Sequence, residues 1–395
     1  MKILVICQYY SPEPFRHPDI CEELQKRGHE VTVVTGLPNY PMGSIYQGYR
    51  NGQKRDERIN GVKVHRCFTI GRRHGAFFRL LNYESFALSS THYVKKSRES
   101  YDVVLIHQLS PVMMAKAGIA YKKRHHTKVV LYCLDLWPES LVAGGIGRNS
   151  VIYRLFHGIS ERIYRNADTI LITSRLFSEY FKEEFNITDT KYLPQYADAV
   201  FIPEQCRKVP NDTVDLMFAG NVGTAQSIDT VLRAAELTSD IANLRWHIVG
   251  DGSESERLKK MAENSPQVIF HGRQPLSKMP EYYAMADAML LTLQKDEILS
   301  MTLPGKLQTY MAAGKPVVGA IDGEAARVIR DADCGVCGEA ENAEALAENV
   351  RRFLRMNHAR LGKNARAYYD RHFSRQTFIG LLEQELKAAA GENET

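Results

Sequence analysis

Short apolar runs alternate with amphipathic stretches through the first half of the chain. The runs are continuous and rich in Val, Ile and Leu, which is typical of parallel strands with helices on both faces. They lie at 3–7, 31–35, 62–66, 102–106, 128–133 and 168–173. Helical spacing of apolar residues follows at 17–28, 77–98, 110–124, 151–166 and 174–185. This order predicts a doubly wound α/β domain.

A second series of the same kind begins after residue 213. Its predicted strands are 214–220, 245–250, 267–271, 287–293 and 316–320. Its predicted helices are 227–239, 254–264, 278–286, 304–313, 341–355, 358–370 and 376–390.

The stretch 193–212 separates the two series, with three prolines and no clear period. We therefore predict two Rossmann-like domains, 1–195 and 213–373, joined by a linker at 196–212. Ligands of such sheets bind at the carboxyl ends of the strands. We expect the two domains to face each other across a cleft that holds the site.

Composition narrows the class of protein. A length of 395 residues suits two domains, and 44% hydrophobic with 25% charged residues is ordinary for a globular protein in water. The net charge of +5 is compatible with anionic substrates or an anionic membrane surface, but it is too small for a nucleic-acid-binding composition. The start of the chain does not resemble a signal peptide, and no apolar stretch reaches the roughly 18–20 residues of a spanning helix. The seven cysteines are scattered, which indicates a reducing cytoplasm.

The segment LPGKLQTYMAAGKPVVGA (303–320) predicts a loop, a short helix and a strand. Pro304 suits a helix start, and Gly314 and Pro316 end the helix. Free N–H groups at the start, the bare backbone of Gly305 and the charge of Lys306 together favour an anion. The alternative is an ordinary helix start with an exposed lysine.

Several motifs in order resemble the retaining glycosyltransferases of family 4, which have the two-Rossmann-domain (GT-B) fold. They are RGHEVTVVT (27–35), DVVLIHQLSP (102–111), FAGNVG (218–223), WHIVGDGSE (246–254), YYAMADAMLLT (282–292) and YMAAGKPVV (310–318). A narrower resemblance is to a bacterial surface-polysaccharide branch that includes N-acetylfucosamine transferases. It lies in PEPFRHPDI (12–20), TGLPNYPMGSIYQGYR (35–50) and DLWPES (135–140).

The resemblance implies a hexosyltransferase reaction without a metal or other cofactor. A sugar, expected to be an N-acetylamino sugar, would move with retention from a UDP-sugar to a polyprenyl-diphosphate-linked acceptor of O-antigen or capsule synthesis. The nucleotide-sugar, a co-substrate, would bind the second domain, and the acceptor the first. The final helix, 374–395, would pack back on the first domain. The protein would work in the cytoplasm, peripheral to the inner face of the membrane, with no nucleic-acid partner.

The donor site implied by the resemblance centres on Lys306 and the turns after the strands of the second domain. Relatives often have two glutamates where this chain has Met301 and Thr309. Glu297 and Glu324 are the candidate replacements, and we choose Glu324 as the donor-binding residue. Arg16 stands where many members have a pair of glycines, and its fork could bind a phosphate. The predicted donor-binding residues are Arg16, Gly220, Asn221, Gly223, Gly250, Arg273, Leu303, Pro304, Gly305, Lys306 and Glu324.

His107 is the predicted catalytic residue, because the resemblance places it beside the donor sugar, where it supports the developing positive charge. The leaving phosphate itself would then accept the proton of the acceptor. The alternative for His107 is a strand-end histidine satisfied by backbone. The predicted acceptor-binding residues follow strands of the first domain, with core packing as the alternative for Trp137. They are Asn39, Tyr40, Asp135, Trp137 and Glu139.

Residues 72–98 mix Arg, His and Lys with Phe and Leu, which favours contact with an anionic bilayer over simple packing on the first sheet. Two patterns are discounted as metal sites. Asp331 and Asp333 match the DxD pattern at a helix end, and Cys334 and Cys337 form a single CxxC without a second pair. Rival functions are a GDP- or dTDP-sugar or hexose donor, a catalytically silent nucleotide-sugar-binding subunit, and an epimerase on the same fold.

Overall fold

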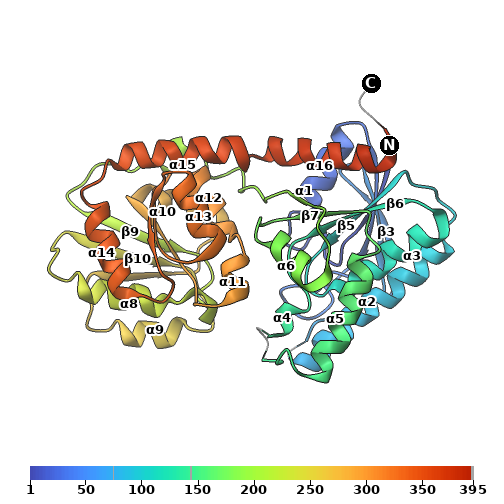
Figure 1. Cartoon of the computed structure of the whole chain (residues 1–395), viewed down its shortest axis with the longest axis horizontal. Coiled ribbons are helices and arrows are strands. Elements are labelled where there is room, and N and C mark those ends of the chain that lie inside the picture. The colour runs from blue at the N-terminus through green and yellow to red at the C-terminus, as the bar shows by residue number, and fades with distance from the viewer. Residues whose placement is uncertain (74, 143–144, 393–395) are drawn as a thin grey trace. The chain divides into compact units, whose positions relative to one another are not determined.

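A computed structural model describes residues 1–73, 75–142 and 145–392 of the chain. The chain forms two compact units, drawn in Figure 1. Unit 1 comprises Met1–Thr173, Phe177–Leu193 and the chain from Ile379 onward. Unit 2 comprises Ser174–Leu176 and Pro194–Phe378.

Unit 1 is built on an eight-stranded sheet with the order β3-β4-β2-β1-β5-β6-β7-β8. All neighbouring strands are parallel except β3 and β4. The order reverses direction between β1 and β5, which makes their carboxyl ends the switch point of the sheet. The strands are β1 (Lys2–Ile6), β2 (Glu30–Gly36), β3 (Asp56–Ile59), β4 (Val62–Cys67), β5 (Val103–Gln108), β6 (Lys128–Cys133), β7 (Thr169–Ile172) and β8 (Thr190–Tyr192).

Burial explains which strands the apolar pattern found. Ile3 of β1 pairs with Val31 on one side and Val103 on the other, and all three side chains are buried. The sequence reading missed β3, because an antiparallel edge strand reading Asp-Glu-Arg-Ile is solvated on one face and has no apolar run.

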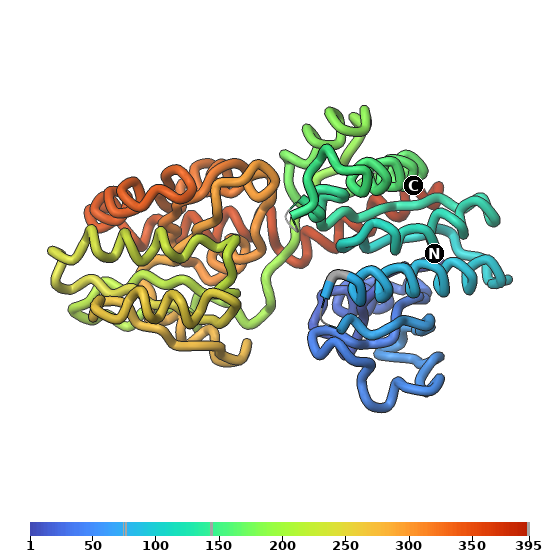
Figure 2. The backbone as a smooth tube through the Cα atoms, turned by 90° about the horizontal axis from the view of Figure 1, so that it is seen from below, coloured from blue at the N-terminus to red at the C-terminus, as the bar shows by residue number. Residues whose placement is uncertain are grey.

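Helices cover both faces of the sheet of unit 1. In Figure 1, α1 and the part of α16 from Ile379 lie on one side, and α2, α3 and α5 lie on the other. Figure 2 shows α2 and α3 side by side. Arg27 and His29 contact Glu383 of α16 at 2.8 and 3.0 Å. The helices are α1 (His17–Lys26), α2 (Ala76–Lys96), η1 (Val112–Ala115), α3 (Lys116–His125), α4 (Glu139–Val142), α5 (Val151–Tyr164), α6 (Phe177–Phe185) and α16 (Arg375–Ala390).

Unit 2 has an all-parallel six-stranded sheet with the order β11-β10-β9-β12-β13-β14, so its switch point lies between β9 and β12. The strands are β9 (Val214–Ala219), β10 (Leu244–Val249), β11 (Val268–Gly272), β12 (Ala288–Thr292), β13 (Val317–Ala320) and β14 (Gly335–Gly338). The helices are α7 (Pro203–Cys206), η2 (Thr224–Gln226), α8 (Ile228–Leu237), α9 (Ser255–Met261), η3 (Leu276–Lys278), α10 (Met279–Met285), α11 (Glu297–Met301), α12 (Gly305–Ala312), α13 (Gly323–Asp331), α14 (Ala343–Phe353) and α15 (His358–His372).

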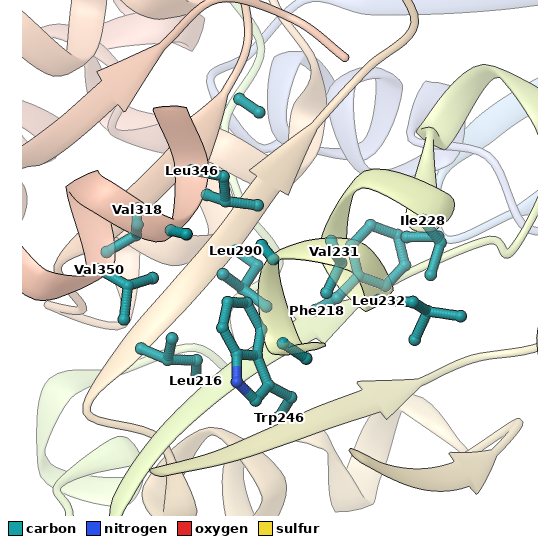
Figure 3. Close-up of a cluster of buried hydrophobic side chains, with 14 of the residues drawn as sticks. Leu216, Phe218, Ile228, Val231, Leu232, Trp246, Leu290, Val318, Leu346 and Val350 are labelled. Atoms are coloured by element: carbon teal, nitrogen blue, oxygen red, sulfur yellow. The ribbon is translucent and has the colours of Figure 1, made fainter. Parts of the chain in front are cut away.

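The core of unit 2 lies between its sheet and α8, α9 and α14. Figure 3 shows Trp246 of β10 at its centre, with Phe218 of β9 and Leu346 of α14 nearby. Each of these side chains is fully buried. Their alternation along the strands leaves the opposite face to α10, α12 and α15. The second sheet therefore confirms the predicted doubly wound fold.

The predicted linker is wrong, because residues 196–212 pack into unit 2. The ring of Phe201 lies 4.8 Å from that of Tyr283, and Lys208 forms an ion pair with Asp215 at 2.6 Å. The short helices α4, α7 and α11 were also not predicted, since each has too few residues to show a helical period. The helix α13 was not among the predicted helices either, although Ala325, Val328 and Ile329 form a buried face at helical spacing. Among the described residues, no helix is long and apolar enough to cross a membrane.

Candidate functional site

The switch point of unit 2 is formed by turns that pack backbone to backbone. Gly220 follows β9 with φ +155°, and Gly250 follows β10 with φ +142°. A Cβ on Gly250 would lie 1.8 Å from the carbonyl oxygen of Gly220, and one on Gly220 would lie 2.9 Å from Cδ of Lys306. Only glycine fits both positions, so the predicted Gly220, Gly250 and Lys306 come together here.

Lys306 is a half-buried cation without an acidic partner among the described residues. Its ammonium contacts Oε1 of Gln226 and lies 4.4 Å from the ring centre of Phe218. Burial lowers its pKa to about 7. Gln226 contributes only a neutral amide to this contact, so it leaves the charge of Lys306 uncompensated. A bound anion would restore the charged form.

The remaining donor-side predictions surround the start of α12. Gly305 is exposed, and Pro304 is the residue that precedes the helix, so the first amides have no partner within the helix. Leu303 is buried, and its side chain serves packing. Thr309 donates its hydroxyl to the carbonyl of Gly305 at 2.9 Å, and Met301 ends α11.

The turns after β9 and β11 complete this edge. Asn221 is exposed, and its amide nitrogen lies 2.6 Å from where a Cβ on Gly223 would be. Gly250 donates its N–H to Gly272 at 2.9 Å, which places exposed Arg273 beside the glycine turns. Glycine and backbone therefore line most of the edge.

Glu324 lies at the start of α13, after β13 and two strands from β9. It is fully buried, and one carboxylate oxygen pairs with Arg327. The other oxygen, Oε1, has no protein partner among the described residues. A carboxylate in this state can accept a ligand hydroxyl.

The switch point of unit 1 holds two histidines. His107 in β5 and His17 at the start of α1 are 3% and 2% exposed, and their ring centroids lie 3.9 Å apart at 78°. None of the four ring nitrogens has a protein partner among the described residues. Burial lowers both pKa values, that of His17 to about 3, so the pair is neutral. Buried polar groups of this kind normally have a partner, so the pair has unused hydrogen-bonding capacity.

His17 is a residue that the sequence reading did not select. It follows Arg16 in the loop after β1, and His107 lies near the end of β5. Both positions are at carboxyl ends of strands, but only the strand order makes β1 and β5 neighbours. Arg16 itself is half-buried, and its carbonyl begins α1 by accepting from Ile20 at 3.1 Å.

Glu13 fixes the predicted acceptor residues against the loop after β1. Its carboxylate accepts the N–H groups of Asn39 and Tyr40 at 2.8 Å each, and that of Tyr10 at 3.3 Å. Burial raises its pKa to about 7. The ring of Tyr40 then lies 5.3 Å from Phe15, which lies 5.6 Å from His17. The structure thus connects Tyr40 to the histidine pair through one aromatic ring.

The side chain of Asn39 is occupied inside the protein, which corrects its prediction as a ligand contact. It is fully buried, donates to the carbonyl of Leu37 at 2.8 Å and accepts from the N–H of Arg72 at 3.1 Å. Its geometry is that of a residue that joins two loops.

The segment DLWPES divides between the sheet edge and the interior. Asp135 accepts the N–H of Ser110 at 3.0 Å beside the end of β5, and burial raises its pKa. Trp137 is buried and packs against Phe156 with 5.2 Å between ring centroids. Trp137 is therefore a core residue, as the alternative interpretation had it.

Glu139 is also a structural residue, contrary to its predicted contact with an acceptor. It is fully buried and accepts from the hydroxyls of Tyr153 and Tyr180 at 2.5 and 3.3 Å. Arg148 donates to its other oxygen at 3.1 Å. With these three partners the carboxylate has little capacity left for a ligand.

The two discounted motifs lie in ordinary structural surroundings. Asp333 pairs with Arg360 at 2.6 Å, and Cys334 and Cys337 are free thiols. Within the described ranges, no group of three or more His, Cys, Asp or Glu side chains is arranged to hold a metal ion.

Comparisons with known proteins agree with the two-unit division of the chain. Residues 17–194 match the family model of the glycosyl transferase 4-like domain, and residues 204–368 match that of glycosyl transferases group 1. A relative from Escherichia coli K12, named as the colanic acid biosynthesis glycosyl transferase WcaI, is 26% identical over 90% of this chain and 92% of its own. The protein named glycosyltransferase WbjE from Pseudomonas aeruginosa is 28% identical over 62% of this chain and 65% of its own.

Solved structures show the same fold at low identity. Sucrose-phosphate synthase from Thermosynechococcus elongatus aligns with a TM-score of 0.75 at 17% identity, over 98% of this chain and 99% of that one. HepE from Anabaena, in complex with UDP and glucose, aligns with a TM-score of 0.68 at 15% identity, over 98% and 100%. The chain therefore belongs to the glycosyltransferases of GT-B fold, in which a glycosyl transferase 4-like domain precedes a group 1 domain.

Proposed function

We propose that the protein transfers a sugar, with retention at the anomeric carbon and without a required metal, from a UDP-sugar to a polyprenyl-diphosphate-linked acceptor. The sugar is an N-acetylamino sugar, as in the N-acetylfucosamine transferases that the sequence resembles. The product is a precursor of a bacterial surface polysaccharide, such as O-antigen or capsule. The name of WcaI refers to colanic acid, which supports a polysaccharide pathway.

One observation carries the donor side of the proposal: a half-buried lysine without a counter-charge at a switch point made of glycine turns. Lys306 has no acidic partner in the described part of the chain, and the turns at Gly220 and Gly250 pack against each other and against its side chain. A diphosphate supplies the missing negative charge and accepts from the free amides at the start of α12. HepE, which shares the fold, holds UDP and glucose in its solved complex, and this supports a nucleotide-sugar donor.

The roles of the residues follow from their charge states. Lys306 takes up a proton as the diphosphate binds, because its pKa of about 7 rises beside an anion. The ammonium then stabilises the charge that grows on the leaving phosphate. His107 stays neutral in its buried site, so its ring can hydrogen-bond a sugar hydroxyl without adding positive charge near an oxocarbenium-like centre. Glu324 receives a hydroxyl on its free oxygen.

Residues 72–98 supply the proposed contact with the inner face of the cytoplasmic membrane. Phe77, Leu80 and Leu88 of α2 are exposed, whereas Phe86 of the same helix is fully buried in unit 1. Arg72 and Arg73 precede the helix. An exposed apolar side beside arginines is typical of a segment that lies on an anionic bilayer.

A mass-spectrometric transfer assay tests the proposal. Purified protein is incubated with a panel of UDP-, GDP- and dTDP-sugars and polyprenyl-diphospho-N-acetylglucosamine, beside the variants His107→Ala and Gly158→Ala. Gly158 is the matched control, because a Cβ there meets nothing within 4 Å. We expect one added sugar from a UDP-linked donor, lost in His107→Ala and kept in Gly158→Ala. Transfer from a GDP- or dTDP-sugar instead would overturn the donor assignment.

The second candidate is a catalytically silent nucleotide-sugar-binding subunit. It is favoured by Met301 and Thr309, which supply no carboxylate where relatives often have glutamates. Tight UDP binding with no product from any donor and acceptor would select this candidate over the transferase.

A further inference from the structure

Two adjoining cavities lie in unit 1 near the end of β2. The first has a volume of about 780 Å³ and the second about 590 Å³, and both are lined by Ser44 and Arg73. Their walls come from the loop 37–55 between β2 and β3 and from the segment 68–79 that leads into α2. Together they form what we call the arginine basin.

The two walls are joined at the level of the backbone. A Cβ on Gly71 would lie 2.7 Å from the carbonyl oxygen of Gly43, which itself has φ +76°. Asn39 accepts from the N–H of Arg72 at 3.1 Å, and Asn82 of α2 donates to the carbonyl of Ile70 at 2.5 Å. These backbone contacts and hydrogen bonds hold the two walls of the basin in place.

Five cations line the basin: Arg50, Arg55, Arg72, Arg73 and Arg79. No acidic side chain lines either cavity, and none of the five has a carboxylate partner within the described ranges. Arg66 of the same unit provides the contrast, because it is buried and paired with Glu57 at 2.7 Å.

Two of the arginines are held by aromatic rings. The guanidinium carbon of Arg72 lies 5.8 Å from the ring centre of Tyr40, and that of Arg73 lies 5.6 Å from Phe78. These contacts position planar forks, which match phosphate oxygens in pairs. Like charges gathered without counter-charge favour a ligand that carries several negative charges close together.

The rim of the basin is apolar. Met42 and Phe68 line the cavities and are 75% and 52% exposed, and Phe77 at the start of α2 is 67% exposed. Free phosphate would make no use of these side chains. A diphosphate attached to a hydrocarbon chain would use both the arginines and the rim.

We infer that the arginine basin binds the diphosphate of the lipid-linked acceptor, with Met42, Phe68 and Phe77 against the first isoprene units. This inference rests on the proposed function, since that function supplies a polyprenyl diphosphate. It adds a site to unit 1 that is separate from the histidine pair. Tyr40 connects the two places, because its ring contacts both Phe15 and the guanidinium of Arg72.

The experiment measures flotation of the full-length protein with phosphatidylcholine vesicles that contain a few per cent of polyprenyl diphosphate, polyprenyl monophosphate or phosphatidylglycerol at matched total charge. Inorganic pyrophosphate is the soluble competitor. The test variant replaces Arg50, Arg55 and Arg73 with Gln. The control replaces Arg58, Arg124 and Arg165, which are exposed in unit 1 but do not line the basin, and changes the net charge equally.

We expect the test variant to lose about tenfold or more in affinity for polyprenyl diphosphate vesicles, since three charge-assisted contacts to the diphosphate are removed. The control should change less than twofold, and both should bind UDP like the unchanged protein, which shows that they are folded. Equal binding to phosphatidylglycerol and diphosphate vesicles would overturn the inference in favour of a general anionic surface. Displacement by pyrophosphate with no benefit from the lipid would overturn the role of the rim.

The failure of this inference differs from the failure of the proposed function. If the unchanged protein transfers sugar and the test variant transfers as well as the control, the basin is not the acceptor site while the function stands. If no donor yields product but binding to polyprenyl diphosphate still depends on the basin arginines, the inference stands without the function.

Discussion

Each of the two sheets has a switch point at the carboxyl ends of its strands, and the side chains at the two switch points differ in charge. At the switch point of unit 2, glycine turns surround one half-buried cation that has no acidic partner among the described residues. At the switch point of unit 1, His17 and His107 fill the space with neutral ring nitrogens that have no partner among the described residues. The first arrangement suits phosphate, and the second suits hydroxyl groups of a sugar. The comparison indicates that the strand order determines where a site lies, whereas the side chains at that place determine which ligand it suits.

Gly250→Ala is expected to have the largest effect, because it puts a Cβ against the carbonyl of Gly220 in a left-handed conformation. We expect unit 2 to lose about 2–4 kcal/mol of unfolding free energy and UDP binding to disappear. Thermal unfolding and titration calorimetry measure both. Gly158→Ala in α5 should be neutral or slightly stabilising. Unchanged UDP binding in Gly250→Ala would remove the glycine turns from the donor site.

His107→Ala tests the switch point of unit 1, where the two histidines are neutral. Transfer should fall by roughly 10²-fold or more, while UDP affinity stays within about twofold, because His107 belongs to unit 1. Initial rates and calorimetry separate the two. An equal fall in UDP affinity would contradict the assignment of UDP binding to unit 2 alone.

His17→Phe sharpens the same comparison, since it keeps an aromatic ring against Phe15 and removes the ring nitrogens. If those nitrogens bind substrate, turnover falls by about tenfold or more while the melting temperature stays close to that of the unchanged protein. Full activity would reduce His17 to a packing residue.

Lys306→Met tests the switch point of unit 2, where Lys306 carries the positive charge. UDP affinity should fall by about tenfold or more, because a charge-assisted contact is lost. The ligand-free protein should become more stable by a few degrees, since about 1 kcal/mol corresponds to roughly 2–4 °C in a domain of this size. The reason is that burial disfavours the ammonium, whose pKa falls from 10.5 to about 7. A lower melting temperature of the variant would contradict the prediction that the Lys306 ammonium destabilises the ligand-free protein.

The same pKa predicts how binding depends on pH. The folded pKa of Lys306 lies below its unfolded value, so its destabilisation is fully present below about pH 7 and is relieved between about 7 and 10.5. UDP binding takes up a proton above about pH 7, and affinity should fall by up to about tenfold per pH unit there. Calorimetry at several pH values measures this slope. Lys306→Met should lack the slope, and its persistence would assign it to another group.

Glu139→Gln should give the smallest effect on function. We expect the free energy of unfolding to fall by roughly 1–3 kcal/mol, because the hydrogen bonds from Tyr153, Tyr180 and Arg148 are weakened. The KM for the acceptor should stay unchanged. An increase in KM at full stability would restore Glu139 to the acceptor site.

The strands show where prediction from sequence succeeds. A fully buried strand such as β5 is a nearly continuous apolar run, so its existence follows from its own residues. The edge strand β3 has no apolar run of its own, because one face is solvated, and the sequence pattern did not predict it. Residues 196–212 resembled a linker because the stretch 193–212 has three prolines and no clear period, but Phe201 and Lys208 contact residues of unit 2 that lie far along the chain.

The sequence by itself determined the α/β class, the two Rossmann-like series, the family, and Lys306 as a cation at a helix start. These properties depend on short-range periodicity and on motifs. Tertiary structure alone decided that His17 meets His107, that Asn39, Trp137 and Glu139 serve the interior, and that the five arginines surround one basin. The physical reason is that a strand order places the ends of distant segments together, and burial then fixes which polar groups remain without partners.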